Sequence, residues 1–533
     1  MKKLNPHKAT DIYDITPAII RDLNDFLPPI LAPLFNNSIE EGQYPDSLKY
    51  TKLIELYKGG DTTLPTSFRP ISLLPIIAKL LDTMINDQLM EHLLKTKQIS
   101  RTQYAFRPGS DTTLALLKVI NDIHRSTDKT GNQKPTIGFY IDLSKAYDTI
   151  SHAKLLEKLD TEFNFAPATL RFFESYLQNR RQETHTQHSA STPQTITHGI
   201  PQGSTLSTTL FLLYINNITK TVPSSTVYTY ADDTTLLVTA DTIEDLQQHA
   251  QNEVNNLVKY FHLNNLVPNP TKTVYTIFYP TTTPPDSLKF TMTNNTALEH
   301  TDSAKLLGIY IQRNLKHHNT ISNIVKKLQP VIQMLRYATT ILPTEYMLKL
   351  YYTFAYPHLI GAISVWGTSS STAEYMQPLR IAHKKIVRIT CNRPPRTHTA
   401  PLLDKYRILD LERLYTLRVS AEMHPHIHPN TKKPAIDRPQ HDHQYVIVTD
   451  VHAHGTRYAK NNIFIPNMHK YSKTQQPIHT STHYAQLHTS VWNNLPNDIS
   501  SITCLTTFKA KLKQYLLDTQ HAQHNAVLKH GHH

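Results

Sequence analysis

Three aspartates stand at the ends of short apolar segments. Asp142 ends the run in TIGFYIDL (136–143), and Asp232 and Asp233 separate the apolar runs of TVYTYADDTTLLV (226–238). Adjacent carboxylates repel one another, and one of them retains its proton unless a cation lies between them. Carboxylates on neighbouring strands can hold two divalent ions about 3.5–4 Å apart, which clamp the oxygens of an in-line displacement at phosphorus. Taken alone, YADD is equally typical of an Asp-rich turn.

The flanking residues predict the elements that would position these aspartates. The runs on either side of Asp232 and Asp233 predict a β-hairpin with the aspartates at its tip. TIGFYIDL predicts a strand that ends on Asp142, and two adjacent strands would bring Asp142 beside Asp232. Further strands are predicted at 48–61, 273–279 and 305–311.

Helical periodicity occupies most of the remaining chain. The predicted helices lie within 17–42, 72–94, 112–126, 151–160, 197–218, 242–260, 323–342, 373–390 and 506–518. Because helices and strands alternate without a strict βαβ repeat, the pattern favours an α+β fold over a doubly wound sheet. The chain after residue 424 is rich in His, Thr, Asn and Pro, which predicts a loosely ordered tail.

The charge of the chain favours a polyanionic partner. Its formal net charge is +13, and residues 301–400 hold 13 basic residues against three acidic ones. Any single basic cluster is as typical of a solvated helix face. Two cysteines exclude a disulfide framework and a Cys-rich zinc site, and neither a signal peptide nor a membrane span is predicted. Sixteen of the 31 histidines lie from His424 onward, without the fixed spacing of a metal site, which favours scattered, solvated histidine.

Ten motifs in a fixed order resemble one known family, the reverse transcriptases of non-LTR retrotransposons (LINE elements) of the jockey and CR1-like kind. The motifs are SFRPISLL (67–74), QYAFRPGSDT (103–112), GFYIDLSKAYDTISH (138–152), GIPQGSTLS (199–207), YADD (230–233), NPTKT (269–273), LLGIYI (306–311), YPHLIGAISVWG (356–367), THTAPLLDKYRILDLERLY (397–415) and VWNNLP (491–496). YADD alone is a weak signal, whereas the ordered set is highly specific.

The resemblance implies a right-hand polymerase fold with fingers, palm and thumb. It implies an antiparallel palm sheet followed by a mainly helical C-terminal region. The expected domains are an N-terminal helical extension (1–55), fingers and palm (56–311), a basic helical thumb (312–400) and a His-rich, partly disordered C-terminal region (401–533).

The implied activity is RNA-directed DNA synthesis. Deoxynucleoside triphosphates would be added to the 3′-hydroxyl of a DNA primer on a template RNA, with Mg²⁺ as cofactor and Mn²⁺ as a substitute, in the cytoplasm and nucleus. Asp142 and Asp232 resemble the principal metal ligands, with Asp233 as their acidic neighbour. The nucleotide and template contacts implied by the motifs are an aromatic gate at Tyr147, a loop of Gly199, Pro201, Gln202, Gly203 and Ser204, the fingers cations Lys58 and Arg69, and Lys272 near the leaving pyrophosphate.

Some features depart from the family pattern, and alternatives stay open. The upstream endonuclease of such elements is not recognised in this chain, TDIYD (10–14) replaces a Gly-Pro-Asp-Gly turn, and Tyr260 stands where Trp is frequent. Tyr147 has a second interpretation, as a core tyrosine at a strand-to-helix turn. The alternative functions are a catalytically inactive, RNA-binding relic of a reverse transcriptase and a DNA-templated nucleotidyltransferase of the palm fold.

Overall fold

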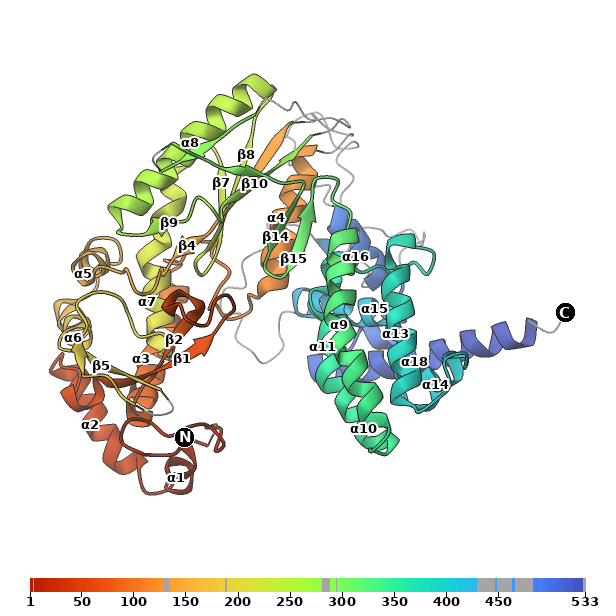
Figure 1. Cartoon of the computed structure of the whole chain (residues 1–533), viewed down its shortest axis with the longest axis horizontal. Coiled ribbons are helices and arrows are strands. Elements are labelled where there is room, and N and C mark those ends of the chain that lie inside the picture. Colours follow the sequence, from red (N-terminus) through yellow and green to blue (C-terminus); the bar gives the residue numbers. More distant parts are fainter. Residues whose placement is uncertain are drawn as a thin grey trace, which may run out of the picture.

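The computed structural model describes residues 1–2, 4–127, 134–186, 189–279, 288–293, 295–428, 446–447, 463–464 and 483–530. Two bodies of the chain are visible in Figure 1: a mixed helix-and-sheet body formed by the first 312 residues and a helical body formed by the rest. No helix among the described residues is long and apolar enough to span a membrane.

The N-terminal part consists of helices and a four-stranded sheet. The strands lie in the order β2-β1-β5-β6, with β1 antiparallel to β2 and parallel to β5. The predicted helix at 17–42 is two helices, because residues 23–27 leave the helical path. The elements are α1 (Pro17–Asp22), α2 (Pro28–Glu40), η1 (Asp46–Leu48), β1 (Tyr50–Tyr57), η2 (Pro65–Ser67), β2 (Phe68–Leu73), α3 (Ile76–Lys95), α4 (Thr112–Thr127), β5 (Arg181–His185) and β6 (Gln194–Thr195). The boundary expected after residue 55 falls inside β1, so the end of the N-terminal extension belongs to this sheet.

A five-stranded sheet forms the centre of the first body. Its order is β13-β10-β3-β8-β7, and all neighbouring pairs are antiparallel except β10 and β13. The sheet and its surrounding elements are β3 (Thr136–Ile141), β4 (Leu143–Ser144), α5 (His152–Thr161), α6 (Pro167–Leu177), α7 (Thr205–Ile215), η3 (Asn216–Thr221), β7 (Thr226–Tyr230), β8 (Asp233–Thr239), α8 (Ile243–Leu263), β9 (Val267–Pro268), β10 (Val274–Phe278), β11 (Thr291–Met292), β12 (Thr296–Ala297) and β13 (Glu299–His300). The fold is therefore α+β with a largely antiparallel central sheet, as predicted.

Both faces of the central sheet are covered, so side chains on both faces of its inner strands are buried. Successive side chains on a strand point to opposite faces. Phe139 and Leu236 pack in one hydrophobic cluster with α7 and α8, whereas Tyr140 and Leu237 pack in another with α4. Figure 1 shows α8 and α4 on opposite sides of the sheet. All six residues of β3 are buried as a result.

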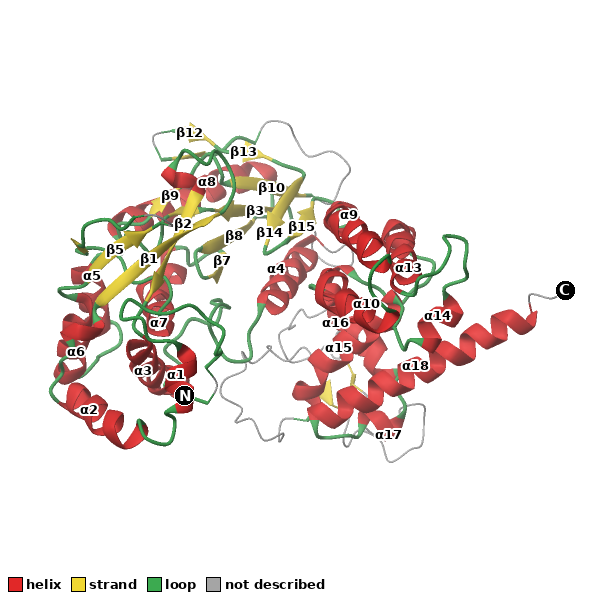
Figure 2. Cartoon of the chain, turned by 60° about the horizontal axis from the view of Figure 1, so that its bottom comes forward, coloured by secondary structure: helices red, strands yellow, loops and turns green. Residues whose placement is uncertain are grey.

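The predicted single strand at 305–311 is instead a hairpin. Its strands are β14 (Ser303–Leu306) and β15 (Ile309–Gln312), with Leu306 opposite Ile309. Leu307 and Gly308 form the turn with φ of 45° and 92°, in the left-handed region that turns of this length require. The hairpin leads directly into the helical body (Figures 1 and 2).

The helices of the helical body pack against one another and also against α4. Helices α12 and α16 contact α4, and the hydrophobic cluster that contains Leu116 and Ile120 of α4 continues to Trp366 and Trp492. The elements are α9 (His318–Thr339), α10 (Thr344–Leu350), the π-helical segment η4 (Tyr351–Ala355), α11 (Tyr356–Ile360), α12 (Ile363–Trp366), η5 (Glu374–Met376), α13 (Gln377–Thr390), α14 (Ala400–Lys405), α15 (Leu411–Ile427), β16 (Val446–Ile447), β17 (Ile463–Phe464), α16 (His483–Asn493), α17 (Asn497–Ser500) and α18 (Leu505–His530).

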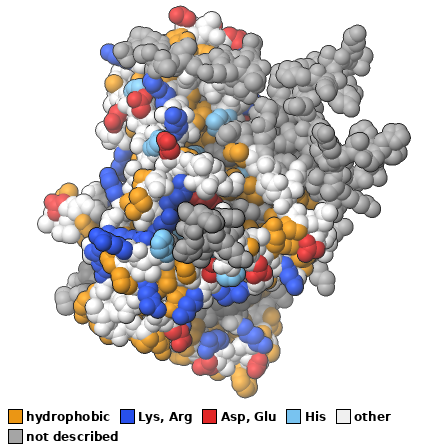
Figure 3. Space-filling model, turned by 90° about the vertical axis from the view of Figure 1, so that its right-hand side faces the viewer, with side chains coloured by type: hydrophobic (Ala, Val, Ile, Leu, Met, Phe, Trp, Pro, Cys, Tyr) orange, Lys and Arg blue, Asp and Glu red, His pale blue; other side chains and the backbone are white. Residues whose placement is uncertain are grey.

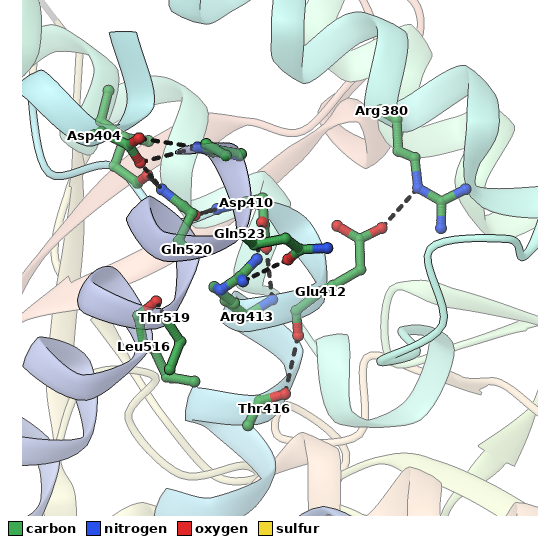
Figure 4. Close-up of polar contacts among 12 residues, drawn as sticks. Arg380, Asp404, Asp410, Glu412, Arg413, Thr416, Leu516, Thr519, Gln520 and Gln523 are labelled. Atoms are coloured by element: carbon green, nitrogen blue, oxygen red, sulfur yellow. Dashed lines mark hydrogen bonds and ion pairs between the residues drawn. The ribbon is translucent and has the colours of Figure 1, made fainter. Parts of the chain in front are cut away.

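Polar contacts join the helices of this body to the C-terminal helix α18 and to one another. Figure 4 shows these contacts, and they involve side chains whose partners lie far away in the sequence. The pairs are Asp404 with Gln520 at 3.2 Å, Arg413 with Gln523 at 2.8 Å and Arg380 with Glu412 at 2.7 Å.

The prediction of a loosely ordered tail is wrong for residues 483–500, where α16 and α17 form, whereas the helix predicted at 506–518 is present as part of the longer α18. Trp492 and Phe508 are fully buried, and α18 packs on α14 and α15. The prediction of solvated histidines is also wrong for two of them, since His424 and His488 are buried and their ring nitrogens lie 2.7 Å and 3.1 Å from backbone carbonyls. Most of the segment 429–482 lies outside the described residues.

Candidate functional site

The predicted hairpin carries Asp232 and Asp233 at its tip. Tyr230 of β7 pairs with Asp233 of β8, so Ala231 and Asp232 form a two-residue turn, in which Ala231 has a φ of 55°. A positive φ in such a turn matches the twist of the flanking strands. On the other side of β8, Ile141 of β3 lies opposite Thr234. Asp142 therefore follows β3 at the same edge of the sheet where the hairpin turns.

The three aspartates influence one another electrostatically. Burial, together with the charges of Asp232 and Asp142, raises the pKa of Asp233 to about 6. The pKa of Asp232 is also raised, first by burial and then by Asp142, whereas Arg69 lowers it. Closely spaced carboxylates raise one another's pKa, and a divalent cation bound between them would offset this repulsion.

The chemistry of this group fits a divalent cation with oxygen ligands. Among the described residues, no three Asp, Glu, His or Cys side chains converge closely enough to hold a metal ion by themselves. Mg²⁺ does not require such a cage, because it binds one or two carboxylates and completes its octahedron with water and phosphate oxygens. Asp142, Asp232 and Asp233 offer only oxygen atoms as metal ligands. They lie at an edge of the central sheet where the side chain of Asp142 is 39% exposed.

Lys272 reaches Asp142 from the NPTKT segment. Its Nζ lies 3.6 Å from Oδ2 of Asp142, and its side chain remains 64% exposed. The position follows from a short ladder between β4 and β9 and from the backbone N–H of Asn269, which donates to the carbonyl of Asp142 at 2.8 Å. Lys272 thus brings a mobile positive charge to the aspartates, where an anionic ligand can share it.

Tyr147 lies beside the aspartates with its ring held by packing. The ring is partly buried and stacks on Phe211 of α7, with centroids 4.6 Å apart and planes inclined by 15°. Burial raises the pKa of the Tyr147 phenol, and the charge of Asp232 raises it further. The phenol is therefore neutral at physiological pH, and the ring is a rigid flat surface next to Asp232.

The loop 199–204 lies against both Tyr147 and strand β2. The backbone N–H of Ile200 donates to the carbonyl of Tyr147 at 3.0 Å, and that of Ser72 donates to the carbonyl of Gln202 at 2.8 Å. Gly203 has a φ of 142°, and a Cβ there would lie 2.6 Å from the Ser72 carbonyl oxygen. Close approach of two backbones explains the glycine.

Lys58 and Arg69, the two cations predicted to belong to the fingers, lie near the end of the β1–β2 pair. Arg69 of β2 is opposite Leu56, its side chain is exposed, and its charge acts on Asp232. Lys58 directly follows β1 and has an exposed side chain, and its backbone N–H donates to the carbonyl of Ser67 at 2.9 Å. Arg69 is thus electrostatically coupled to the aspartates.

The basic residues of 301–400 divide into two groups. Arg380 donates to Glu412 and to two backbone carbonyls, and Arg388 donates to the carbonyl of Thr397, so these two stabilise the helical body itself. Lys326 and Lys327 on α9 and Lys384 on α13 are exposed. Figure 3 views the molecule from the side of these helices and shows Lys and Arg spread over that face, together with some Asp and Glu side chains.

Two residues next to the site were missed in the sequence. Asp148 accepts a hydrogen bond from Nε2 of Gln202 at 2.9 Å, and Phe211 supports the ring of Tyr147. Asp148 directly follows Tyr147, and this position next to a predicted site residue could have indicated it. Phe211 lies on a helix that is apolar on all sides, where nothing in the sequence singles out one aromatic residue.

Comparison with known proteins identifies the class of the central domain. Residues 57–311 match the family described as reverse transcriptase (RNA-dependent DNA polymerase). This range contains the three aspartates, Tyr147, the loop 199–204 and Lys272. Residues 57–311 therefore form a domain of the reverse transcriptase family.

Individual relatives show which reverse transcriptases the chain is similar to. The chain is 25% identical over 426 residues to the RNA-directed DNA polymerase from mobile element jockey of Drosophila melanogaster, covering 77% of this chain and 45% of the relative. It is 24% identical over 388 residues to the probable RNA-directed DNA polymerase from transposon BS of the same species, covering 70% and 42%. Within its family the protein is therefore related to the reverse transcriptases of jockey-type non-LTR retrotransposons. The chain spans less than half the length of these curated relatives.

Among solved structures, the chain is similar to one described as telomerase from Candida albicans in complex with a TWJ fragment of telomeric RNA. The identity is 10%, the TM-score is 0.41, and the match covers 73% of this chain and 69% of the other. At this level of similarity the match serves only as a distant likeness.

Proposed function

We propose that the protein is an RNA-directed DNA polymerase that adds deoxynucleotides to the 3′-hydroxyl of a DNA primer on an RNA template. The observation that carries the proposal is the position of Asp142 beside the Asp232–Asp233 hairpin, within the range that matches the reverse transcriptase family. Phosphoryl transfer requires positioning and charge neutralisation more than covalent chemistry from the protein, and this edge of the sheet combines carboxylates with cations.

Asp142 and Asp232 would hold Mg²⁺, with Asp233 as their acidic neighbour. When bound, Mg²⁺ would lower the pKa of the primer hydroxyl and offset charge on the α-phosphate. Lys272 would leave Asp142 to bind the anionic triphosphate, which is supported by its distance of 3.6 Å and its exposure. Arg69 would bind the same triphosphate from strand β2, and Lys58 is its neighbour at the end of the strand pair.

Tyr147 and the loop 199–204 would orient the incoming nucleotide. The flat ring of Tyr147 would lie beneath the sugar and exclude a 2′-hydroxyl, the group that distinguishes ribonucleotides from deoxynucleotides. Gln202 and Gly203 would contact nucleotide and template through a loop that the hydrogen bonds to Tyr147 and Ser72 hold in place.

The helices of 312–400 would act as the thumb that follows the fingers and palm of 56–311. Their exposed lysines would bind the phosphates of the template–primer duplex without reading its sequence. An A-form-like duplex is recognised mainly by its shape and backbone, which suits a surface of flexible cations.

Primer extension with the purified chain tests the proposal. A labelled DNA primer is annealed to an RNA template and, in parallel, to a DNA template of the same sequence, with deoxynucleotides and Mg²⁺. We expect extension on RNA that stops when EDTA removes the metal. Binding of RNA without extension would favour the inactive RNA-binding alternative, and extension on the DNA template alone would favour a DNA-templated polymerase.

A further inference from the structure

A buried polar cluster lies at the far end of the loop 199–204. Asp82 on α3 is fully buried, although helix α3 carries it in the apolar segment IIAKLLDTM. Its Oδ1 accepts a hydrogen bond from the hydroxyl of Tyr44 at 2.9 Å, and its Oδ2 accepts one from the hydroxyl of Ser204 at 2.5 Å. Burying a carboxylate carries a high free-energy cost, so a buried aspartate calls for a specific reason.

Ser204 is the residue that joins this cluster to the loop. Besides donating to Asp82, its Oγ accepts the backbone N–H of Leu206 at 3.1 Å and so forms the N-cap of α7. Ser204 is 2% exposed. Its hydroxyl can donate only one hydrogen bond, and the acceptor of that bond is Asp82. Asp82 thereby fixes both the rotamer of the cap and the point where the loop ends.

Arg180 supplies a positive charge to the cluster without a direct contact to the loop. It is 1% exposed, its Nη1 donates to the Tyr176 carbonyl at 3.1 Å, and its guanidinium lies 4.8 Å from the Tyr176 ring centroid. Its Nε and Nη2 have no hydrogen-bond partner among the described residues. The charge of Arg180 acts on Asp82 and opposes the effect of burial on the pKa of that carboxyl.

Hydrogen bonds hold the loop at its beginning, its middle and its end. Its first residues bond to the segment that carries Tyr147, through Gly199 to Ile150 and Ile200 to Tyr147. Its middle bonds to β2 through Gln202 and Ser72. At its end, Ser204 donates to Asp82 on α3 at 2.5 Å and accepts a longer hydrogen bond, 3.4 Å, from the Tyr176 hydroxyl. The last attachment is a side-chain contact and can be removed without altering the backbone.

We propose that Asp82 is a positioning residue for polymerisation, which sets the loop 199–204 against Tyr147 and β2 through its hydrogen bond to Ser204. The inference rests on the function proposed above, because it gives this loop its role at the nucleotide. Asp82 does not contact the nucleotide. Small displacements of groups that orient a substrate lower rates strongly, by up to about a hundredfold for 1 Å.

The chain offers a matched control for a purely structural effect. Tyr44 donates to the other oxygen of the same carboxylate, and it lies before β1 rather than in the loop. Tyr44→Phe therefore weakens the cluster and leaves the bond to Ser204 in place. Asp82→Asn weakens the hydrogen bond to the loop by changing its acceptor, and Ser204→Ala removes this bond by deleting its donor.

The kinetic experiment compares these variants in primer extension on RNA, after circular dichroism has verified folding. We expect Asp82→Asn and Ser204→Ala to lower kcat/KM for the deoxynucleotide at least about tenfold, with unchanged affinity for the template–primer. The double variant should be no worse than the poorer single one, since both remove one interaction. Tyr44→Phe should lower the melting temperature but keep kcat/KM within about twofold of the parent.

Amide hydrogen exchange gives a second readout that does not depend on activity. We expect faster exchange at residues 199–206 in Asp82→Asn and Ser204→Ala, and parent-like exchange there in Tyr44→Phe. Unchanged exchange and kinetics in folded Asp82→Asn and Ser204→Ala would overturn the proposal, and so would an equal defect in Tyr44→Phe. If the parent extends no primer, the proposed function fails, whereas the exchange data still decide whether Asp82 orders the loop.

Discussion

The ring of Tyr147 lies flat on the ring of Phe211, with centroids 4.6 Å apart and planes within 15° of parallel. Phe211 belongs to α7, the helix that begins at the end of the loop 199–204. The orientation of the proposed gate, Tyr147, is therefore coupled to the same helix that anchors the loop. Substitutions of Tyr147 and of Phe211 can both test this relationship.

Substitutions at Tyr147 test the gate separately from the metal site. Tyr147→Ala should admit ribonucleotides, because the ring that excludes the 2′-hydroxyl is gone, whereas Tyr147→Phe should retain discrimination. Phe211→Leu should weaken discrimination partially, since it removes the stacking partner. The measurement is the ratio of kcat/KM for a deoxynucleotide to that for its ribonucleotide. An unchanged ratio in an active Tyr147→Ala protein would leave Tyr147 as a packing residue.

Asp232→Asn tests the metal site. The change removes a charge but conserves volume, so incorporation should fall by several orders of magnitude while the fold persists. Asp160→Asn on α5 is the matched control, because Asp160 is exposed and lies outside the site. Activity of Asp232→Asn within about tenfold of the parent, at saturating Mg²⁺, would contradict the assignment.

Gly203→Ala and Gly308→Ala form a matched pair for the loop. Both glycines have a positive φ, so both substitutions strain the backbone. A Cβ at Gly203 would lie 2.6 Å from the Ser72 carbonyl, whereas nothing lies within 4 Å at Gly308. We expect Gly203→Ala to lose primer extension and Gly308→Ala to lose mainly stability, measured by thermal unfolding. Equal loss of extension in the two would indicate that the contact with β2 is unimportant.

Binding of a template–primer duplex should depend strongly on salt. If about five phosphates are neutralised, log K should fall against log salt with a slope of about −4 to −5. Replacing both exposed lysines of α9, Lys326→Gln and Lys327→Gln, should reduce the magnitude of this slope by about 2. Lys95→Gln and Lys97→Gln, which also neutralise exposed lysines, serve as the control. A flat salt series for the parent would refute the thumb interpretation.

His383 predicts a pH dependence of stability in the helical body. Burial lowers the pKa of this imidazole to about 4, and its Nε2 lies 3.0 Å from the Tyr351 hydroxyl. Between about pH 4 and 6.5 the unfolded chain binds the proton more readily, so stability is present above pH 6.5 and is lost as the pH falls. This residue should contribute a loss of about 2 kcal/mol between pH 7 and 5.

Denaturant unfolding at the two pH values measures that contribution. His383→Gln should lose less stability than the parent over this interval, even if it is less stable at pH 7. His398→Gln replaces an exposed histidine and should behave like the parent. The same loss in His383→Gln as in the parent would show that other groups account for the pH effect.

The sequence predicted the elements around the site because their signals are local. The hairpin at 226–238 and the strand before Asp142 carry the apolar runs and turn residues that such elements need. Their position side by side was predicted from the resemblance of the motifs to a known family, because no local signal specifies that β3 lies next to β8. The turn at Leu307 was missed because a leucine with positive φ breaks the usual preference.

Long-range polar contacts were beyond the reach of sequence patterns. Asp82 occurs in a helical segment where an aspartate usually marks the solvent face, and only the packing of α3 on α7 buries it. The same applies to His424 and His488, whose partners are carbonyls 78 and 124 residues away. Composition therefore predicted a loosely ordered segment where α16 packs into the hydrophobic core, although the helical pattern at 506–518 did predict part of α18.

Helix α4 packs on the central sheet with one part of its surface and on α12 and α16 with another. The family match ends at residue 311, yet the apolar side chains of α4 have neighbours on both sides of that boundary. The domain recognised by homology is thus smaller than the unit that shares this hydrophobic core. Removal of the C-terminal helices would expose the apolar side chains of α4 that contact α12 and α16, so the matched region depends on them for part of its packing.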